Sequence, residues 1–237
     1  MSEDQREHRS EERARSGALG GSEPLNSVSQ TTVHLMRHGE VHNPAGVLYG
    51  RLPGYRLSVT GEAMALAGAE WFADKGVTHL VASPLERAQQ TAQPISDALG
   101  LEIHTDDRII EAGNAFEGKT FGVGDGALRR PANWWLMRNP FRPSWGEPYV
   151  EIAARMLAAV ETARDAARGS AAVLVSHQLP IWTVRLHVEG RRYVHDPRRR
   201  ECGLASVTSL SYDGDRLVGI SYAEPAGATD PDEVPGA

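Results

Sequence analysis

The sequence contains only one cysteine, and this scarcity excludes several kinds of protein. Cys202 has no second cysteine to pair with inside the chain, so no disulfide framework can hold the domain together. A lone thiol also excludes zinc sites made of several cysteines, and it fits a reducing compartment. The first fifteen residues carry too many charges for the apolar segment of a secretory signal. We therefore expect a cytoplasmic protein.

A long apolar run and an excess of positive charge are missing as well. No stretch approaches the roughly 18 consecutive apolar residues that a membrane-spanning helix needs. The formal net charge is −6, and it comes from the ends of the chain, because residues 31–222 contain equal numbers of acidic and basic residues. A neutral central region gives no reason to expect a nucleic acid or a membrane as a partner.

The chain divides into one domain and two polar ends. Residues 1–30 and 223–237 hold almost no large apolar side chains, so burial cannot offset the entropy of ordering them. We expect a disordered N-terminal arm and a disordered acidic tail around a domain at 31–222. Within it, residues 119–149 hold four prolines and three tryptophans and interrupt the pattern of the domain. We interpret them as an excursion or lid over one edge of the fold.

Strand and helix signals alternate within the domain. Strands are expected at 32–36, 77–82, 101–104 and 172–176, and helices at 60–75, 83–99 and 149–168, with Pro180 opening another helix. Thr60 and Ser83 are the expected N-caps of the first two helices, and Gly76 and Gly100 their stops. An Asp213-Gly214 turn joins two last strands, at 205–212 and 216–222. The alternation predicts an α/β fold, a three-layer sandwich whose mostly parallel central sheet is flanked by helices.

Three strand ends carry side chains that suit phosphate chemistry. Arg37 and His38 follow the first strand, Arg87 lies in the first helical turn after the second, and His177 follows the apolar strand 172–176. Ligands bind at the carboxyl ends of the strands in such sheets, so we expect these four side chains to converge. The planar fork of arginine binds phosphate oxygens, and an imidazole acts as nucleophile, base or ligand.

This convergence predicts a site that holds a phosphoryl group and offers it a nucleophile without a metal ion. A proton donor for the leaving oxygen is also needed, and Glu111 is the candidate. Each residue alone has a plainer interpretation: a surface Arg37-His38 pair, a solvent-pointing Arg87, a histidine at the core edge for His177, and a solvated Glu111. Their combination favours the chemical interpretation.

A three-histidine metal site is an alternative. His34, His38 and His42 recur every four residues, a spacing that would place them on one face of a helix. The segment is β-prone and is interrupted by Gly39, which disfavours a helix. We therefore expect no metal site.

Five blocks of sequence carry a family resemblance. They read LMRHGE at 35–40, LSVTG at 57–61, SPLERA followed by TA within 83–92, Glu111 followed by FEG at 116–118, and VSH at 175–177. In order and spacing they resemble the histidine phosphatase superfamily, also called the phosphoglycerate-mutase-like family, and they favour its phosphatase branch. The resemblance covers most of residues 31–222.

The resemblance implies a role for each residue of the predicted site. His38 matches the nucleophile that becomes phosphohistidine, and Arg37, Arg87 and His177 match the residues that hold the phosphoryl oxygens. Glu111 matches the general acid, which protonates the leaving oxygen and then activates water. The resemblance implies neither a metal nor an organic cofactor.

Substrate-side positions depart from the family pattern. Asn43 and Gly50 lie near the family's substrate-side loop, but the family's asparagine sits one residue later, where this chain has Pro44. Gln178 stands where the family commonly has glycine, and we expect it to narrow the pocket or donate a hydrogen bond to the substrate. Pro148 replaces the serine or threonine that often follows Gly-Glu before the long helix. These departures bear on substrate choice rather than on the chemistry.

The expected activity is metal-independent hydrolysis of a small phosphorylated metabolite through a phosphohistidine. Attack requires a neutral His38, whose pKa the adjacent arginines should lower, whereas His177 should work as a cation. A phosphoglycerate-mutase-type phosphotransferase and a non-catalytic phospholigand-binding module are the alternatives, although residues 119–149 show no match to a mutase lid. The tryptophans of that segment are candidates for substrate specificity, and the oligomeric state stays open.

Overall fold

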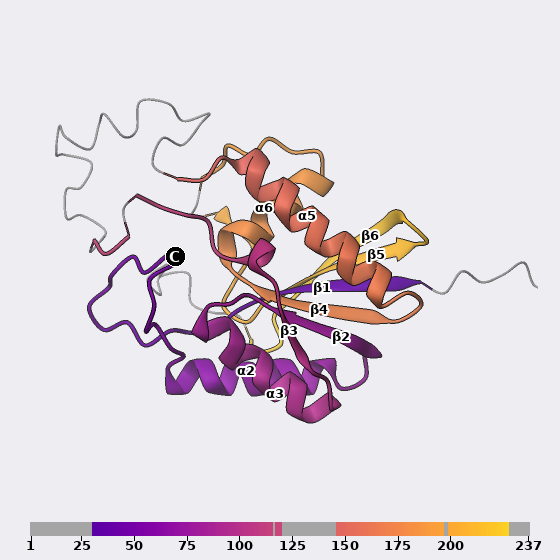
Figure 1. Cartoon of the computed structure of the whole chain (residues 1–237), viewed down its shortest axis with the longest axis horizontal. Coiled ribbons are helices and arrows are strands. Elements are labelled where there is room, and N and C mark those ends of the chain that lie inside the picture. Colours follow the sequence, from indigo (N-terminus) through magenta and orange to yellow (C-terminus); the bar gives the residue numbers. More distant parts are fainter. Residues whose placement is uncertain (1–29, 116, 120–145, 197–198, 228–237) are drawn as a thin grey trace, which may run out of the picture.

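Six strands form one sheet that carries helices on both faces (Figure 1). The computed structural model describes residues 30–115, 117–119, 146–196 and 199–227. The strands are β1 (Thr31–Arg37), β2 (Val77–Ala82), β3 (Ile103–Thr105), β4 (Ala171–Ser176), β5 (Val207–Asp213) and β6 (Arg216–Ala223). The helices are α2 (Val59–Phe72), α3 (Glu86–Leu99), α5 (Tyr149–Ala166) and α6 (Gln178–Val188), with a short 3-10 helix, η1, at Asp107–Ile109. Helices α2 and α3 cover one face and α5 and α6 the other, which confirms the predicted three-layer α/β sandwich.

The strand order places the ends of β1 and β4 side by side. The order is β3-β2-β4-β1-β5-β6, with the first four strands parallel and the hairpin of β5 and β6 antiparallel. Arg37, the last residue of β1, is in register with Ser176, the last residue of β4. The next residue on each strand is a histidine, so His38 and His177 meet at the same edge of the sheet.

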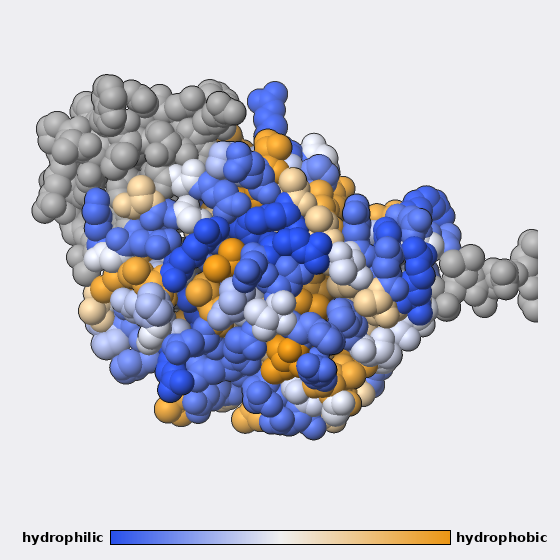
Figure 2. All heavy atoms as spheres, viewed as in Figure 1, coloured by the Kyte–Doolittle hydropathy of each residue, from blue (hydrophilic) through white to orange (hydrophobic). Residues whose placement is uncertain are grey.

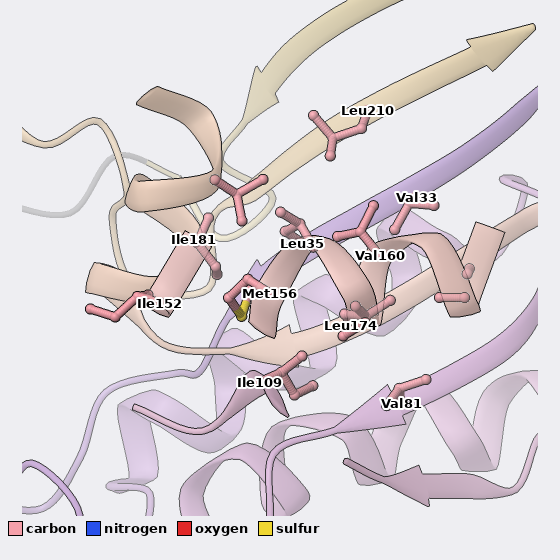
Figure 3. Close-up of a cluster of buried hydrophobic side chains, with 14 of the residues drawn as sticks. Val33, Leu35, Val81, Ile109, Ile152, Met156, Val160, Leu174, Ile181 and Leu210 are labelled. Atoms are coloured by element: carbon pink, nitrogen blue, oxygen red, sulfur yellow. The ribbon is translucent and has the colours of Figure 1, made fainter. Parts of the chain in front are cut away.

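The two central strands are buried on both faces, as their apolar sequences require. Alternate side chains point to opposite faces of a strand, so Leu35 and Leu174 enter the cluster under α5 and α6, while Met36 and Val173 enter the cluster over α2 and α3. Figure 3 shows the first cluster, in which Met156 of α5 lies against the strands. Packing from both sides fixes the strand ends and therefore the residues that follow them.

Two helix starts differ from the prediction. Helix α2 is capped by Ser58, whose hydroxyl accepts from the Gly61 N–H at 3.0 Å, and not by Thr60. Helix α3 begins at Glu86 rather than at Ser83, whose hydroxyl lies 2.7 Å from Nε2 of His177 and accepts from the Leu85 N–H at 3.4 Å. The predicted stop at Gly100 is confirmed: the residue has a φ of +66°, a left-handed conformation that glycine adopts without strain.

The predicted bounds of β2 and the predicted start of α5 at Tyr149 are confirmed, whereas several other boundaries shift by one to three residues. Strand β3 begins at Ile103 rather than at residue 101, β5 at Val207 rather than 205, and α6 at Gln178 rather than at Pro180. Pro180 sits in the first turn of α6, where the helix needs no backbone N–H from it.

The ends of the described region do not all match the predicted division of the chain. Strand β6 extends to Ala223, and the Gly227 N–H bonds to the carbonyl of Glu224, so the tail predicted from residue 223 begins with ordered structure. Residues 1–29, 228–237 and most of the predicted excursion, 120–145, lie outside the described residues.

The surface in the view of Figure 2 is mostly hydrophilic, with apolar residues in small scattered groups. None of the helices in the described part of the chain is long and apolar enough to cross a bilayer.

Candidate active site

The site forms at the edge where β1 and β4 end. The backbone N–H of His38 donates to the carbonyl of Ser176 at 3.0 Å, which extends the β1–β4 pairing by one residue. The imidazole rings of His38 and His177 then lie with their centroids 5.1 Å apart. Both side chains are completely buried. Residues 139 positions apart in the chain thus meet because their strands are neighbours.

A close approach of two loops fixes the backbone after His38. A Cβ atom at Gly39 would meet the carbonyl oxygen of Gly61 at 2.5 Å, and one at Gly61 would overlap the carbonyl oxygen of Glu40. Only glycine fits at these two positions without movement of the backbone. The Gly39 N–H also donates to the hydroxyl of Thr91, one helical turn beyond Arg87 on α3.

The hydrogen bonds of His38 place its proton on Nδ1 and leave Nε2 unprotonated. Nδ1 lies 2.8 Å from the carbonyl oxygen of Gly39, and since a carbonyl only accepts, Nδ1 carries the proton. Nε2 then accepts from Nε of Arg87 at 3.2 Å. Burial first, and the charges of Arg87 and Arg37 next, hold the pKa of His38 well below its usual range. The expectation of a neutral His38 is confirmed, although burial contributes more than the arginines do.

Arg87 joins the parts of the site. Its Nη2 donates to the carbonyl of Gly50 at 2.7 Å and to Nδ1 of His177 at 3.2 Å. The guanidinium also lies over the ring of Tyr49, 4.7 Å from its centroid. A buried arginine in the first turn of a helix opposes the helix dipole. Its contacts to both histidines explain why this chain has an arginine there.

Burial and hydrogen bonding favour the neutral form of His177, and its expected action as a cation toward a bound phosphoryl group stays a prediction. Its Nδ1 accepts from Arg87, and its Nε2 donates to the hydroxyl of Ser83 at 2.7 Å. Burial first, and then the charge of Arg87, hold the pKa of His177 well below its usual range.

Arg37 presents one unsatisfied donor. Its Nη1 donates to the carbonyl of Cys202 at 2.8 Å, while its Nε is buried and has no hydrogen-bond partner among the described residues. An unpaired buried donor costs on the order of 1–3 kcal/mol. A phosphate oxygen would satisfy it.

Glu111 has the environment of a general acid. Its Oε1 accepts from the N–H of Ala112 at 2.7 Å, and its Oε2 is buried, with no hydrogen-bond partner in the part of the chain that the structure describes. Burial raises the pKa of the carboxyl, while the Ala112 hydrogen bond and the charges of Arg87, Arg200 and Arg37 act against the rise. A carboxyl with a raised pKa retains its proton closer to neutral pH, which proton donation requires.

A charged network holds the irregular segment that carries Glu111. Nε of Arg51 donates to the Glu111 carbonyl at 2.6 Å, and Nη1 of Arg155 donates to the carbonyls of Arg108 and Ile110 at 2.7 Å. The carboxylate of Glu147 lies between the two arginines, 2.9 Å from Arg51 and 2.7 Å from Arg155. The backbone of Glu111 is thereby anchored to the loop of residue 51 and to α5.

The three residues predicted on the substrate side, Asn43, Gly50 and Gln178, lie in different surroundings. The carbonyl of Gly50 orients Arg87, as described above. The side-chain amide of Asn43 bonds to both the N–H and the carbonyl of Val47, so it closes its own loop. Gln178 accepts from Nη1 of Arg200 at 3.0 Å, and its Nε2 lies 3.4 Å from the carbonyl of Cys202. Their roles toward a substrate remain predictions.

Tyr49, Arg51 and Arg200 are part of the site and were missed by sequence reasoning. Each reaches it from a loop, and each contacts residues at least 22 positions away in the sequence. No local pattern marks such residues. The sequence has more arginines than the predicted site uses, but this surplus does not single out Arg51 or Arg200.

The three-histidine alternative is not formed. His34 is buried in the core beside Trp71 and Phe72, and its Nδ1 bonds to the hydroxyl of Ser209 at 2.8 Å. His42 is exposed on the surface. Within the described residues, no group of three or more His, Cys, Asp or Glu side chains is placed to hold a metal ion.

The arrangement is suited to a dianionic tetrahedral group. Guanidinium groups of Arg37 and Arg87 accompany a neutral imidazole whose Nε2 is unprotonated, and one protonatable carboxyl lies nearby. Burial strengthens these electrostatic interactions by excluding water.

Comparisons with known sequences cover most of the chain. Residues 33–224 match the family model described as the histidine phosphatase superfamily (branch 1). An uncharacterized protein of Mycobacterium tuberculosis is 59% identical over 197 residues, which span 83% of this chain and 98% of that protein. A probable phosphoglycerate mutase of Yersinia enterocolitica is 32% identical over 184 residues, which span 74% of this chain and 83% of the mutase.

Solved structures show the same architecture. A mycobacterial glucosyl-3-phosphoglycerate phosphatase superimposes with a TM-score of 0.63 at 25% identity, covering 77% of this chain and 90% of that one. A phosphoserine phosphatase of Entamoeba histolytica in complex with 3-phosphoglyceric acid gives a TM-score of 0.67 at 21% identity, covering 83% of this chain and 99% of the other. The second likeness concerns the fold alone.

Proposed function

Because the chain belongs to the histidine phosphatase superfamily, we propose that it hydrolyses phosphomonoesters through a phosphohistidine on His38, without a metal ion. One observation carries the proposal. At the strand edge, the unprotonated Nε2 of His38, which accepts from Arg87, accompanies two buried groups that have no hydrogen-bond partner among the described residues, Nε of Arg37 and Oε2 of Glu111. A phosphomonoester supplies the oxygen for the first of these groups and the leaving oxygen for the second.

The first step transfers the phosphoryl group to the enzyme. Nε2 of His38 attacks phosphorus, the bond between phosphorus and the ester oxygen breaks, and Glu111 gives its proton to that oxygen. The products are an alcohol, a phosphohistidine and an ionised Glu111. The hydrogen bond from Nδ1–H of His38 to Gly39 fixes the ring orientation and leaves Nε2 as the attacking atom.

The second step regenerates the enzyme. A water molecule gives a proton to the carboxylate of Glu111 as its oxygen attacks phosphorus, and the bond between phosphorus and Nε2 breaks. Inorganic phosphate leaves, His38 is neutral again, and Glu111 is again the acid. Arg37 and Arg87 stabilise the charge on the phosphoryl oxygens in both steps.

The proposed substrate is a small phosphorylated metabolite, and the proposed compartment is the cytoplasm. We propose no nucleic acid or membrane partner. Hydrolysis is favoured over a non-catalytic role because the nucleophile, the acid and the phosphate-binding residues converge in one site. A solved relative with a phosphatase activity in its name supports hydrolysis over transfer.

The proposal is tested by replacing the nucleophile. His38→Ala should reduce hydrolysis of p-nitrophenyl phosphate to background, while circular dichroism shows a folded protein. His42→Ala, which removes an exposed histidine four residues away, is the matched control and should retain full activity. EDTA should leave the wild type active. Substantial turnover by His38→Ala would refute the assignment.

A phosphoglycerate-mutase-type transfer is the second candidate, because a relative 32% identical is described as a probable phosphoglycerate mutase. Incubation with 3-phosphoglycerate and a trace of 2,3-bisphosphoglycerate, followed by ³¹P NMR, separates the two reactions. A hydrolase releases inorganic phosphate, whereas a mutase accumulates 2-phosphoglycerate.

A further inference from the structure

A third guanidinium, that of Arg200, lies beside the site and forms no ion pair within the described part of the chain. Its Nε donates to Nε2 of His195 at 2.8 Å, and its Nη1 donates to Oε1 of Gln178 at 3.0 Å. His195 places its Nδ1 proton on the carbonyl of Tyr193, so both partners of Arg200 are neutral acceptors. Among the described residues, Arg200 forms no ion pair and its Nη2 has no hydrogen-bond partner.

Arg200 is linked directly to the residues that would hold the phosphoryl group. Gln178 follows His177 in the chain, and its Nε2 lies 3.4 Å from the carbonyl of Cys202. That carbonyl also accepts from Nη1 of Arg37 at 2.8 Å. Arg200 lies close enough to Glu111 for each charge to act on the other, and Arg37 repels it. Arg200 therefore belongs to the same part of the site as Arg37 and Arg87.

The charges of the site do not balance with a simple monoester. Arg37, Arg87 and Arg200 carry three positive charges, while a phosphoryl dianion brings two negative charges and the acid form of Glu111 brings none. Arg200 is partly buried, and a matching anion on a ligand offsets the cost of desolvating its charge. The neutral partners at Nε and Nη1 hold the guanidinium in place without neutralising it.

We propose that Arg200 binds a second anionic group of the substrate, so that the natural substrates are phosphomonoesters that also carry a carboxylate or another phosphate. The inference rests on the proposed function of the site. It also changes the role expected of Gln178, which orients Arg200 instead of meeting the substrate directly.

The test compares two ligands that differ only in the second anion. 3-Phosphoglycerate and glycerol 3-phosphate have the same three-carbon backbone and phosphate, but the first has a carboxylate where the second has a hydroxymethyl group. A charge-assisted hydrogen bond should make kcat/KM of the wild type about tenfold or more higher for 3-phosphoglycerate. Calorimetric binding to the His38→Ala protein should show the same preference without turnover.

Variants of one loop separate substrate recognition from structure. Arg200→Gln should bring the ratio of the two ligands close to one in both measurements, and Arg200→Lys should keep part of the preference. Arg199→Gln removes the neighbouring exposed arginine and should keep the full ratio. If the wild type hydrolyses neither compound while the binding preference depends on Arg200, the hydrolase proposal fails and the inference stands.

Two results would overturn the inference. One is a wild type that does not distinguish the two ligands. The other is an Arg200→Gln protein that loses activity and affinity equally for both, with a lower melting temperature, which would give Arg200 only a structural role.

Discussion

His38 and His177 stand at equivalent ends of neighbouring strands, yet their hydrogen bonds give them different chemistry. His38 places its proton on the Gly39 carbonyl through Nδ1, whereas His177 places its proton on the Ser83 hydroxyl through Nε2. In His38 the unprotonated nitrogen that can attack is therefore Nε2. In His177 the unprotonated nitrogen is Nδ1, which accepts from Arg87. The sequence predicts two histidines at this edge of the sheet. Which ring nitrogen of each carries the proton follows only from their hydrogen-bond partners.

Replacement of Glu111 tests the general acid. Glu111→Gln should lower kcat about 10²- to 10⁴-fold for an alkyl phosphate, because the leaving alkoxide is no longer protonated. The loss should be much smaller for p-nitrophenyl phosphate, whose leaving group needs little protonation. Burial raises the pKa of Glu111, so wild-type kcat should fall as the pH rises through that pKa, and the variant should lack this limb. Glu151→Gln, which changes an exposed residue of α5, is the control. Equal losses of kcat on both substrates in Glu111→Gln would contradict a general-acid role for Glu111.

Binding of phosphate should place a proton on His177. Nδ1 can donate to a phosphoryl oxygen only if it is protonated, and the anion offsets the burial and the charge of Arg87 that lower the pKa of the free residue. Calorimetry with inorganic phosphate at about pH 7.5, in two buffers of different ionisation enthalpy, measures this uptake. The wild type should take up a substantial fraction of one proton, and His177→Gln should take up less. Equal uptake in both proteins would show that the proton goes elsewhere.

At the scale of elements, the strands position the nucleophile and the loops position the acid. The burial pattern of β4 and the strand-end residues Arg37, His38 and His177 could be predicted from sequence, because parallel strands end at a common edge. The anchoring of Glu111 could not be predicted, because Arg51, Glu147 and Arg155 come from three separated segments. Contacts of this kind depend on the completed fold.

The network around Glu147 should act through the position of Glu111. Glu147→Gln removes the charge that holds Arg51 and Arg155 together, so the segment at 108–111 loses its anchor. We expect kcat for an alkyl phosphate to fall about tenfold, with a smaller change in KM and a shifted pH limb of kcat. Glu147→Asp should recover part of the activity. Glu161→Gln, an exposed change on α5, should have no effect; a Glu147→Gln protein with an unaltered pH profile would contradict a positioning role.

Helix starts show where local signals compete. Ser83, Pro84 and Glu86 form a good capping pattern, but the Ser83 hydroxyl bonds to His177, and α3 begins three residues later. Ser58 caps α2 in place of the predicted Thr60. The Ser83 hydroxyl contacts both His177 and the Leu85 N–H, and the sequence alone does not show at which residue the helix begins.

At the scale of the whole molecule, buried neutral histidines couple stability to pH. Burial, with a smaller contribution from Lys75, lowers the pKa of His34 to about 4. The unfolded chain then binds a proton that the folded chain refuses, so stability is lost as the pH falls from about 6.5 to about 4. His34 alone should cost on the order of 3 kcal/mol of unfolding free energy across this window. His38 and His177 act in the same direction.

Urea denaturation at about pH 7 and about pH 4.5 measures this effect. His34→Gln should show a smaller loss of unfolding free energy between the two pH values than the wild type, whatever its absolute stability. His42→Gln, at an exposed position, should follow the wild type. An unchanged difference in His34→Gln would mean that the acid sensitivity comes from other groups.

The charge of the whole domain does not reveal the local charge of the site. The domain at 31–222 is neutral by sequence, yet Arg37, Arg87 and Arg200 gather at one edge of its sheet. Sequence predicted the fold class and the four strand-end residues because periodicity and strand direction decide them. The third arginine depends on a loop that returns to the site 22 residues after Gln178, which no periodicity describes.

The central claim is a covalent phosphohistidine on His38. Rapid mixing with a ³²P-labelled phosphomonoester, alkaline quenching and peptide mapping test it most directly, since phosphohistidine survives base and is lost in acid. The account predicts label on the peptide that contains His38, formed as fast as turnover requires and absent from His38→Ala. Turnover without labelled protein, or label that persists in His38→Ala, would contradict it.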